Sequence, residues 1–172
     1  MSELVTKERL EVLASLAVKY LRDAEQAAET GLFDWACVMA GAGIEAGILA
    51  HACVCERELR AADEWRETRK APFDWRFEDL IRIAAAMRWL PVAASLDADE
   101  PVGKLGGEIG DAVRFVQYAR NLTVHPGRHV HDMPWLESLG RDEYTIAYGV
   151  ARGVFTHLHK ALEELGEDAA PQ

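Results

Sequence analysis

The sequence predicts an all-α protein, an up-down bundle of about four or five helices. Apolar residues recur at helical spacing over several long segments, the pattern of helices that bury one face. No segment of useful length alternates apolar and polar residues as a half-buried strand does. With 172 residues and 49% hydrophobic content, the chain can build one core of its own. We expect a single helical domain over residues 1–166 and a frayed acidic tail over 167–172.

The first predicted helix begins after Thr6, whose hydroxyl can cap it, and runs to about Glu29. Gly31 suits its C-terminal end, because glycine adopts the left-handed conformation without strain. Residues 32–70 predict a second helix, or two helices joined by a bend.

The segment 36–54 is apolar on nearly all sides and is interrupted only by Glu45 and His51. A buried central helix is favoured over a membrane span, because a carboxylate lies within the segment and no basic residues flank it. The glycines of this segment favour close packing of helices over a phosphate-binding loop, since no strand precedes them. They are Gly41, Gly43 and Gly47.

Three more helices are expected further along the chain. The first starts at a cap on Asp74 and is stopped by Pro91. Residues 92–107, rich in acidic residues and glycine, predict a loop or a short helix followed by a loop. The other two helices are predicted at 108–124 and at 142–165, and Gly166 ends the last of them.

The net charge of −10 excludes a general nucleic-acid-binding surface, and we expect no DNA partner. The net charge is positive over residues 111–131, which hold three arginines and one aspartate. The same segment also holds three histidines. Any contact with nucleic acid is therefore expected to be local and near this segment.

Cysteine usage and the N-terminal sequence predict a cytoplasmic protein. The chain has three cysteines, an odd number that fits a reducing compartment better than a disulfide framework. The first residues do not follow the secretory pattern of a basic region, an apolar core and a cleavage site.

Arg120 is the residue that a plain helical bundle does not explain. It falls in the middle of the apolar stripe of helix 108–124, where a permanently charged guanidinium needs a partner, a hydrated cleft or an interface. Pro126 disfavours the helical conformation of its predecessor, so the helix should end at about Val124. His125 then leaves the helical phase, and its imidazole can converge with the guanidinium on one cleft.

This stretch, Arg-Asn-Leu-Thr-Val-His-Pro-Gly from Arg120 to Gly127, resembles the signature of the HEPN families. In that signature an arginine, a polar residue, a few spacers and a histidine end a late helix, here as Arg120, Asn121 and His125. The apolar string around Glu45 also resembles the HEPN helix that carries one internal glutamate. The resemblance implies a small helical bundle that forms a homodimer, with the motif at the dimer seam.

Active HEPN proteins are metal-independent endoribonucleases, so the resemblance implies a ribonuclease of the toxin, stress or defence type. His125 would act as general base or acid, since its pKa lies nearest neutrality. Arg120 would hold the phosphate and neutralise charge in the transition state, and Asn121 would position the phosphate or the imidazole. Arg114 and Arg128 are candidate contacts to the RNA backbone, and Tyr118 could stack on a base. No cofactor or metal is expected, and the partners would be RNA and an antitoxin or another protein.

Arg120 and His125 can also be explained by purely structural roles. Glu45 could tie Arg120 into the core as an ion pair without chemistry, and His125 could cap the helix C-terminus. The rival function is therefore a non-enzymatic HEPN-like module that dimerises or binds a partner, which the acidic composition favours.

Metal binding has little support from spacing. Among His51, Cys53 and Cys55, only the first and last share a helix face, and two ligands do not make a zinc site. The cysteines and the five tryptophans are expected to pack in the core.

Overall fold

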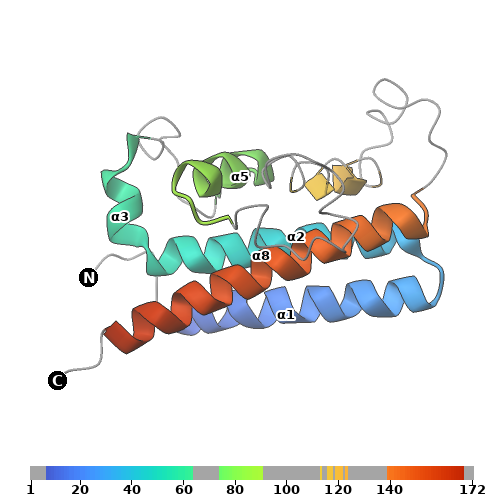
Figure 1. Cartoon of the computed structure of the whole chain (residues 1–172), viewed down its shortest axis with the longest axis horizontal. Helices are drawn as coiled ribbons and strands as arrows, with labels where there is room; N and C mark the ends of the chain where they lie inside the picture. The colour runs from blue at the N-terminus through green and yellow to red at the C-terminus, as the bar shows by residue number, and fades with distance from the viewer. Residues whose placement is uncertain are drawn as a thin grey trace.

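The structure is a computed structural model that describes residues 7–63, 74–90 and 139–168, together with 113, 116, 117, 119–121 and 123. For residues 7–9 and 161–168 only the backbone is described. The described residues contain helices and no strand, so the predicted all-α class is confirmed (Figure 1). The helices are α1 (Lys7–Glu29), α2 (Phe33–Val54), α3 (Glu56–Ala61), α5 (Phe77–Ala86) and α8 (Arg141–Asp168).

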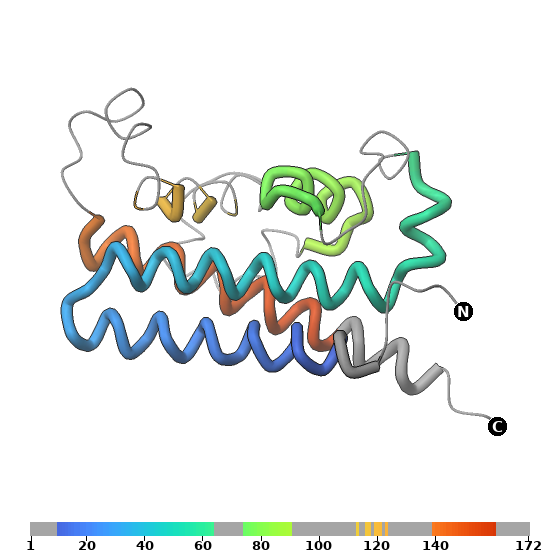
Figure 2. Tube along the Cα trace, turned by 180° about the vertical axis from the view of Figure 1, so that it is seen from behind, coloured from blue at the N-terminus to red at the C-terminus, as the bar shows by residue number. Residues whose placement is uncertain are grey.

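Helix α2 is the centre of the molecule. Helix α1 runs antiparallel beside it, and α8 crosses in front of α2, so that the three long helices pack on one another (Figure 1). The short α5 packs on the opposite side of α2 from α1 (Figure 2). The core between these helices is built mainly of aliphatic residues. Its largest fully buried members are Ile44, Ile48, Leu59, Leu80, Ile83, Val113, Val116, Val150 and Val154.

Helix α1 ends as its sequence predicts. Gly31 adopts a left-handed conformation with φ of 78°. The N–H groups of Gly31 and Leu32 donate to the carbonyls of Ala28 and Ala27, at 3.0 and 2.9 Å. This pair of hydrogen bonds is the Schellman motif, which satisfies the last carbonyls of the helix and turns the chain into α2.

The second predicted segment is two helices joined by a bend. The chain turns at Cys55, between α2 and α3, and no described helix spans the whole of 32–70. By length and hydropathy α2 could cross a bilayer, but 72% of its most apolar window is buried inside the fold. Its apolar residues are used to contact α1, α5 and α8, as expected of a central core helix.

The ends of α5 differ from the prediction. The helix starts at Phe77, three residues after Asp74, and Asp79 accepts a hydrogen bond from the N–H of Arg76 at 3.3 Å. It stops before Pro91 is reached, because Arg88 takes a left-handed φ of 58°. The N–H of Trp89 then donates to the carbonyl of Ala84 at 2.8 Å. The carboxylate of Asp79 caps the start of the helix, and the left-handed backbone at Arg88 decides its end; the composition reveals neither.

Helix α8 begins as predicted and continues further. The carboxylate of Glu143 accepts a hydrogen bond from the N–H of Gly140 at 2.9 Å, which caps the N-terminus. The helix passes through Gly166 and ends at Asp168, so Gly166 does not terminate it. Glycine inside a helix costs only about 1 kcal/mol relative to alanine, which neighbouring residues can offset. The predicted apolar stripe is buried at Ala147, Val150, Ala151, Val154 and Leu158.

Candidate functional site

The described part of the motif helix confirms its apolar stripe. Residues 113, 116, 117, 119–121 and 123 are helical. Val113, Val116 and Ala119 are buried in the core. Arg120 and Asn121, which follow Ala119 in the helix, are half-buried. The other predicted site residues, His125, Arg114, Arg128 and Tyr118, lie outside the described residues.

The structure brings Arg120 and Glu45 together. Nη2 of Arg120 lies 3.1 Å from Oε2 of Glu45, on α2. The two side chains remain 28% and 26% exposed, so water and solutes reach the pair. The ion pair therefore anchors the guanidinium without enclosing it. Because guanidinium has five N–H donors, one contact to a carboxylate leaves others for a second anion.

Two further residues fix the position of the Arg120 side chain. Its Cζ lies 5.4 Å from the ring centroid of Phe77, the first residue of α5, within the range of a cation–π contact. Its aliphatic stem passes over Gly41, where a Cβ would lie 3.2 Å from Cδ. Glycine at this position leaves the space that the stem occupies. Gly41 and Glu45 are one helical turn apart, so one face of α2 both admits and anchors the arginine.

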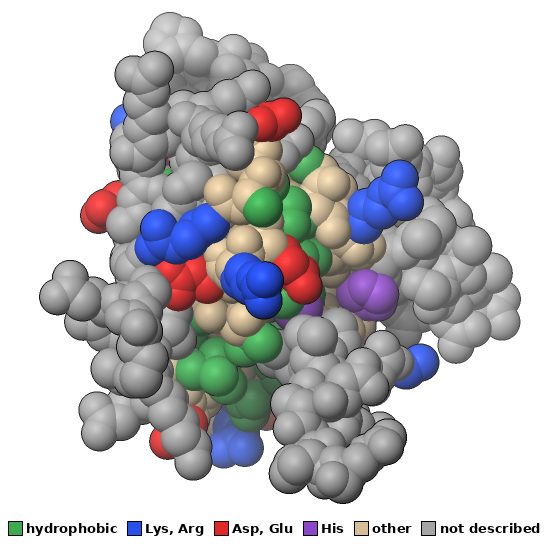
Figure 3. Space-filling view, turned by 90° about the vertical axis from the view of Figure 1, so that its left-hand side faces the viewer, with side chains coloured by type: hydrophobic (Ala, Val, Ile, Leu, Met, Phe, Trp, Pro, Cys, Tyr) green, Lys and Arg blue, Asp and Glu red, His purple; other side chains and the backbone are tan. Residues whose placement is uncertain are grey.

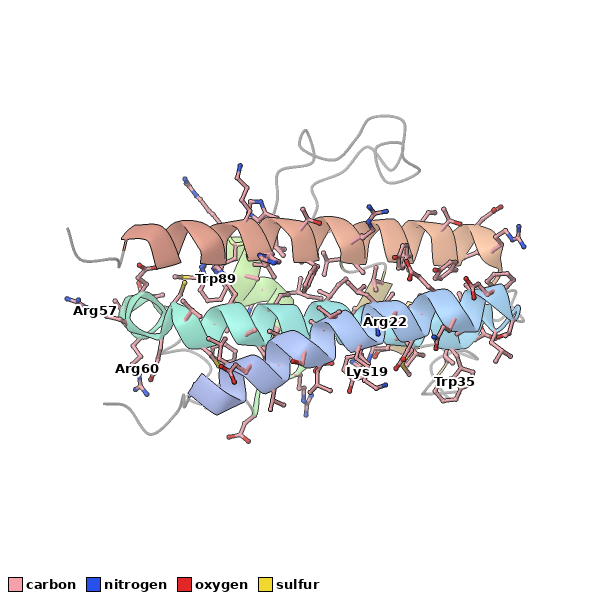
Figure 4. All side chains as sticks on the ribbon, turned by 90° about the horizontal axis from the view of Figure 1, so that it is seen from below. Lys19, Arg22, Trp35, Arg57, Arg60 and Trp89 are labelled. Atoms are coloured by element: carbon pink, nitrogen blue, oxygen red, sulfur yellow. The ribbon has the colours of Figure 1, made fainter. Side chains whose placement is uncertain are left out.

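The pair lies beside an open face of α2. Trp35, Ala42 and Leu49 are spaced seven residues apart, which places them on one side of the helix with Glu45 close by. Trp35 is 53% exposed, so the prediction that it packs in the core is wrong. Ala42, Glu45 and Leu49 are half-buried. Figure 2 shows α2 in front of α8, with α1 below and α5 above, and Figure 4 shows Trp35 projecting away from the helices.

Comparison with known proteins identifies no relative. No family model, curated protein or solved structure matches the chain.

The described surface carries mixed charge. Figure 3 faces the end of the bundle where α3 lies, and its basic side chains stand among acidic ones. Arg60 is paired with Glu56 at 2.7 Å, and on α1 Lys19 is paired with Asp23. On the face shown in Figure 3, the described residues form no broad basic surface. This agrees with the net charge of −10.

The buried titratable groups lie away from this pair. Burial raises the pKa of the Cys37 thiol to about 12 and that of Cys55 to about 11. Such thiols stay protonated at neutral pH, so they are poor nucleophiles. All three cysteines are buried, as predicted. No group of three or more candidate ligands for a metal ion occurs within the described ranges.

His51 is the one polar side chain buried among the described residues, at 3% exposure. Its Nε2 lies 3.5 Å from Sγ of Cys55, and its ring meets the edge of Trp89 at a centroid distance of 4.9 Å. Its Nδ1 has no hydrogen-bond partner in the described part of the chain. Burial, together with the nearby His157, lowers the pKa of His51 to about 4. His51 is therefore neutral at physiological pH, and we assign it to the core.

Sequence reasoning missed Phe77 and the role of Gly41 at the site. Phe77 belongs to a helix that the sequence does not connect with the motif, so no local signal marks it. Gly41 does carry a signal, because it precedes Glu45 by one turn on an otherwise apolar helix. A small residue one turn from a carboxylate on an apolar helix indicates room for the partner of that carboxylate.

Proposed function

We propose that the protein is a HEPN-like helical bundle that acts as a metal-independent endoribonuclease, with a composite active site at a homodimer seam. One observation carries the proposal. A guanidinium on the core-facing side of a late helix is held by Glu45 and Phe77, yet remains about a quarter exposed, five residues before a His-Pro sequence. Because the pair is only partly buried, the remaining N–H donors of the guanidinium are within reach of a phosphate.

The proposed chemistry divides between Arg120 and His125. His125 as general base removes the proton of a ribose 2′-hydroxyl, whose oxygen attacks the adjacent phosphorus. The bond to the 5′-oxygen breaks, and an imidazolium returns a proton to that oxygen. The products are a 2′,3′-cyclic phosphate and a free 5′-hydroxyl. Arg120 binds the non-bridging oxygens and stabilises the charge that develops on them.

Glu45 and Asn121 support this chemistry indirectly. Glu45 orients the guanidinium through one edge and leaves the remaining donors for phosphate. Asn121, half-buried next to Arg120, can position the phosphate or the imidazole. Both are positioning residues in this proposal.

The open face of α2 supports the homodimer seam. Apolar residues at a seven-residue spacing, Trp35, Ala42 and Leu49, suit the pairing of two helices. Because Glu45 stands beside them, pairing through this face would bring two Arg120–Glu45 pairs close together. We propose a cytoplasmic toxin, stress or defence protein, with cellular RNA as substrate and an antitoxin or another protein as further partner.

The proposal is tested by RNA cleavage in EDTA. Wild type, His125→Ala and Arg120→Ala are incubated with a panel of single-stranded and structured RNAs, after circular dichroism has shown that each variant is helical. We expect cleavage by wild type and a loss of about 10²-fold or more in each variant. Ends are assigned by mass spectrometry, and 2′-deoxy substitution at the cleaved site should block the reaction.

Absence of cleavage by folded wild-type protein across the panel would rule out the nuclease. So would equal cleavage by His125→Ala. A folded, inactive protein that still dimerises through α2 would instead be the non-enzymatic module, which the acidic composition favours.

A further inference from the structure

A second feature of the structure is an apolar pocket between the three long helices. It has a volume of about 260 Å³. Helix α1 lines it with Ala14 and Ala17, α2 with Gly47 and Ala50, and α8 with Phe155 and Leu158. His159, whose ring meets that of Phe155 edge-on, is the one polar side chain in the lining. The pocket lies on a different face of α2 from the Arg120–Glu45 pair.

The pocket opens where α1 and α2 cease to touch closely. At Gly43 a Cβ would lie 3.3 Å from Cδ2 of Leu21 and 3.6 Å from the carbonyl oxygen of Ala17, so the two backbones meet tightly there. One turn further along α2, at Gly47, no atom of α1 lies among the near neighbours. The small side chains of both helices leave the resulting space unfilled.

Gly47 has no conformational or packing reason to be glycine. Its backbone is helical without a positive φ, and a Cβ there would meet only Cδ1 of Leu158, at an ordinary 3.5 Å. Gly41 and Gly43 differ, since each admits a close neighbour. Glycine inside a helix is less stable than alanine. What glycine at 47 does provide is room in the wall of the pocket.

We propose that this pocket binds a small uncharged apolar molecule of about the size of indole. An apolar protein cavity of about 150 Å³ accommodates benzene, so the larger volume here suits a bicyclic ring or a short branched chain. The lining offers alkyl and aromatic contacts and no paired charges, which excludes a strongly charged ligand. The ring of Phe155 provides an aromatic contact for a planar ligand.

The pocket is tested by ¹⁹F NMR with 5-fluoroindole, and by thermal shift with benzene and naphthalene as further probes. We expect saturable binding to the full-length protein and a raised melting temperature. Cross-relaxation between the ring and the side chains of Phe155 and Leu158 should place the probe. Ala14→Leu, at the exposed mouth, should weaken binding by about tenfold or more because the added side chain occupies the pocket.

Ser15→Leu is the matched control. It adds the same side chain at an exposed neighbouring position that does not line the pocket, and binding should stay within about twofold of wild type. Gly47→Ala should weaken binding while it stabilises the free protein. No saturable binding of any of the three probes would overturn the proposal. Equal binding by wild type and Ala14→Leu would overturn it as well. Neither result depends on ribonuclease activity.

Discussion

Glu45 is the residue that determines what Arg120 can do. Without the carboxylate of Glu45, the guanidinium would lie beside Phe77 and the core with no counter-charge among the described residues. With Glu45 in place, the positive charge of Arg120 is compensated while both side chains remain partly exposed to solvent. Removing one partner of a fully buried pair costs roughly 3–5 kcal/mol because the other charge is left uncompensated, whereas a typical surface pair is worth about 0–1 kcal/mol. Because water reaches both side chains here, the loss of Glu45 should cost an amount between these limits. Glu45 therefore fits a role in positioning as well as in folding.

His51 predicts a specific dependence of stability on pH. Its pKa is lowered from 6.5 to about 4 in the folded protein, so the unfolded chain binds more protons between these values. The free energy of unfolding should therefore fall as the pH falls from 6.5 to 4, by up to about 3 kcal/mol from this residue. Urea denaturation at a series of pH values measures it.

A leucine at position 51 separates this contribution from those of other groups. His51→Leu should flatten the dependence over that window, because no imidazole has to be protonated there. The matched control is His159→Gln, at an exposed position of α8, which should leave the dependence in place. An unchanged slope in His51→Leu would show that other groups cause the acid sensitivity.

At the scale of elements, the glycines of α2 make three different contributions. The sequence predicts close packing at all three, and this is confirmed at Gly41 and Gly43. The prediction is wrong at Gly47, where a Cβ would have room because only Leu158 lies within van der Waals distance. Spacing along one helix cannot distinguish these cases, because the neighbour that makes glycine necessary comes from another part of the chain.

Alanine substitutions should separate these contributions. Gly47→Ala should raise the free energy of unfolding by about 1 kcal/mol, the difference in helix propensity, because its Cβ has room. Gly43→Ala should lose this gain or become destabilising, since Leu21 must move. Gly41→Ala should displace the stem of Arg120 and lower cleavage more than stability. Equal stabilisation by all three would contradict the packing described.

Helix ends provide a second test at this scale. Gly31 and Arg88 occupy the same left-handed position at the ends of α1 and α5. The left-handed conformation strains side chains with a Cβ. Gly31→Ala should therefore destabilise the protein by roughly 1 kcal/mol, and Arg88→Gly should stabilise it by a similar amount. Thermal melts measure the melting temperatures of the two variants. A shift in the same direction for both would contradict the left-handed conformation of Gly31 and Arg88.

The helices and their ends were predictable from the sequence where neighbouring residues determine them. The apolar stripes of α1 and α8 and the glycine at the end of α1 follow from the sequence alone. The ends of α5 do not, because an arginine in a left-handed conformation has no compositional mark. The same holds for the continuation of α8 through Gly166, which depends on the balance between helix propensity and the rest of the helix.

At the scale of the whole molecule, the open face of α2 predicts self-association. Trp35 is 53% exposed on that face, so Trp35→Glu should shift the protein from dimer to monomer in sedimentation velocity. Val12→Glu places the same charge at an exposed position of α1 and should leave the mass unchanged. A wild-type monomer at all concentrations, or a dimer in both variants, would exclude this face as the seam.

The candidate site was predictable only in part. The position of Arg120 within an apolar stripe and the carboxylate of Glu45 inside the apolar part of α2 mark both members of the pair from sequence. Their contact, and the ring of Phe77 that completes the setting, depend on how the motif helix, α2 and α5 pack together. That arrangement is set by long-range packing, which helical periodicity does not encode.

In the proposed function, the guanidinium of Arg120, anchored by Glu45, binds the phosphate of the RNA. The most direct measurement is NMR of its Nε–Hε resonance, assigned with Arg120→Lys, during titration with an RNA that 2′-O-methylation makes uncleavable. We expect this resonance to shift and saturate together with RNA binding, and to shift less in Glu45→Gln, where the guanidinium loses its anchor. A resonance that stays unchanged while the RNA binds elsewhere, or with no binding at all, would show that Arg120 serves the scaffold alone.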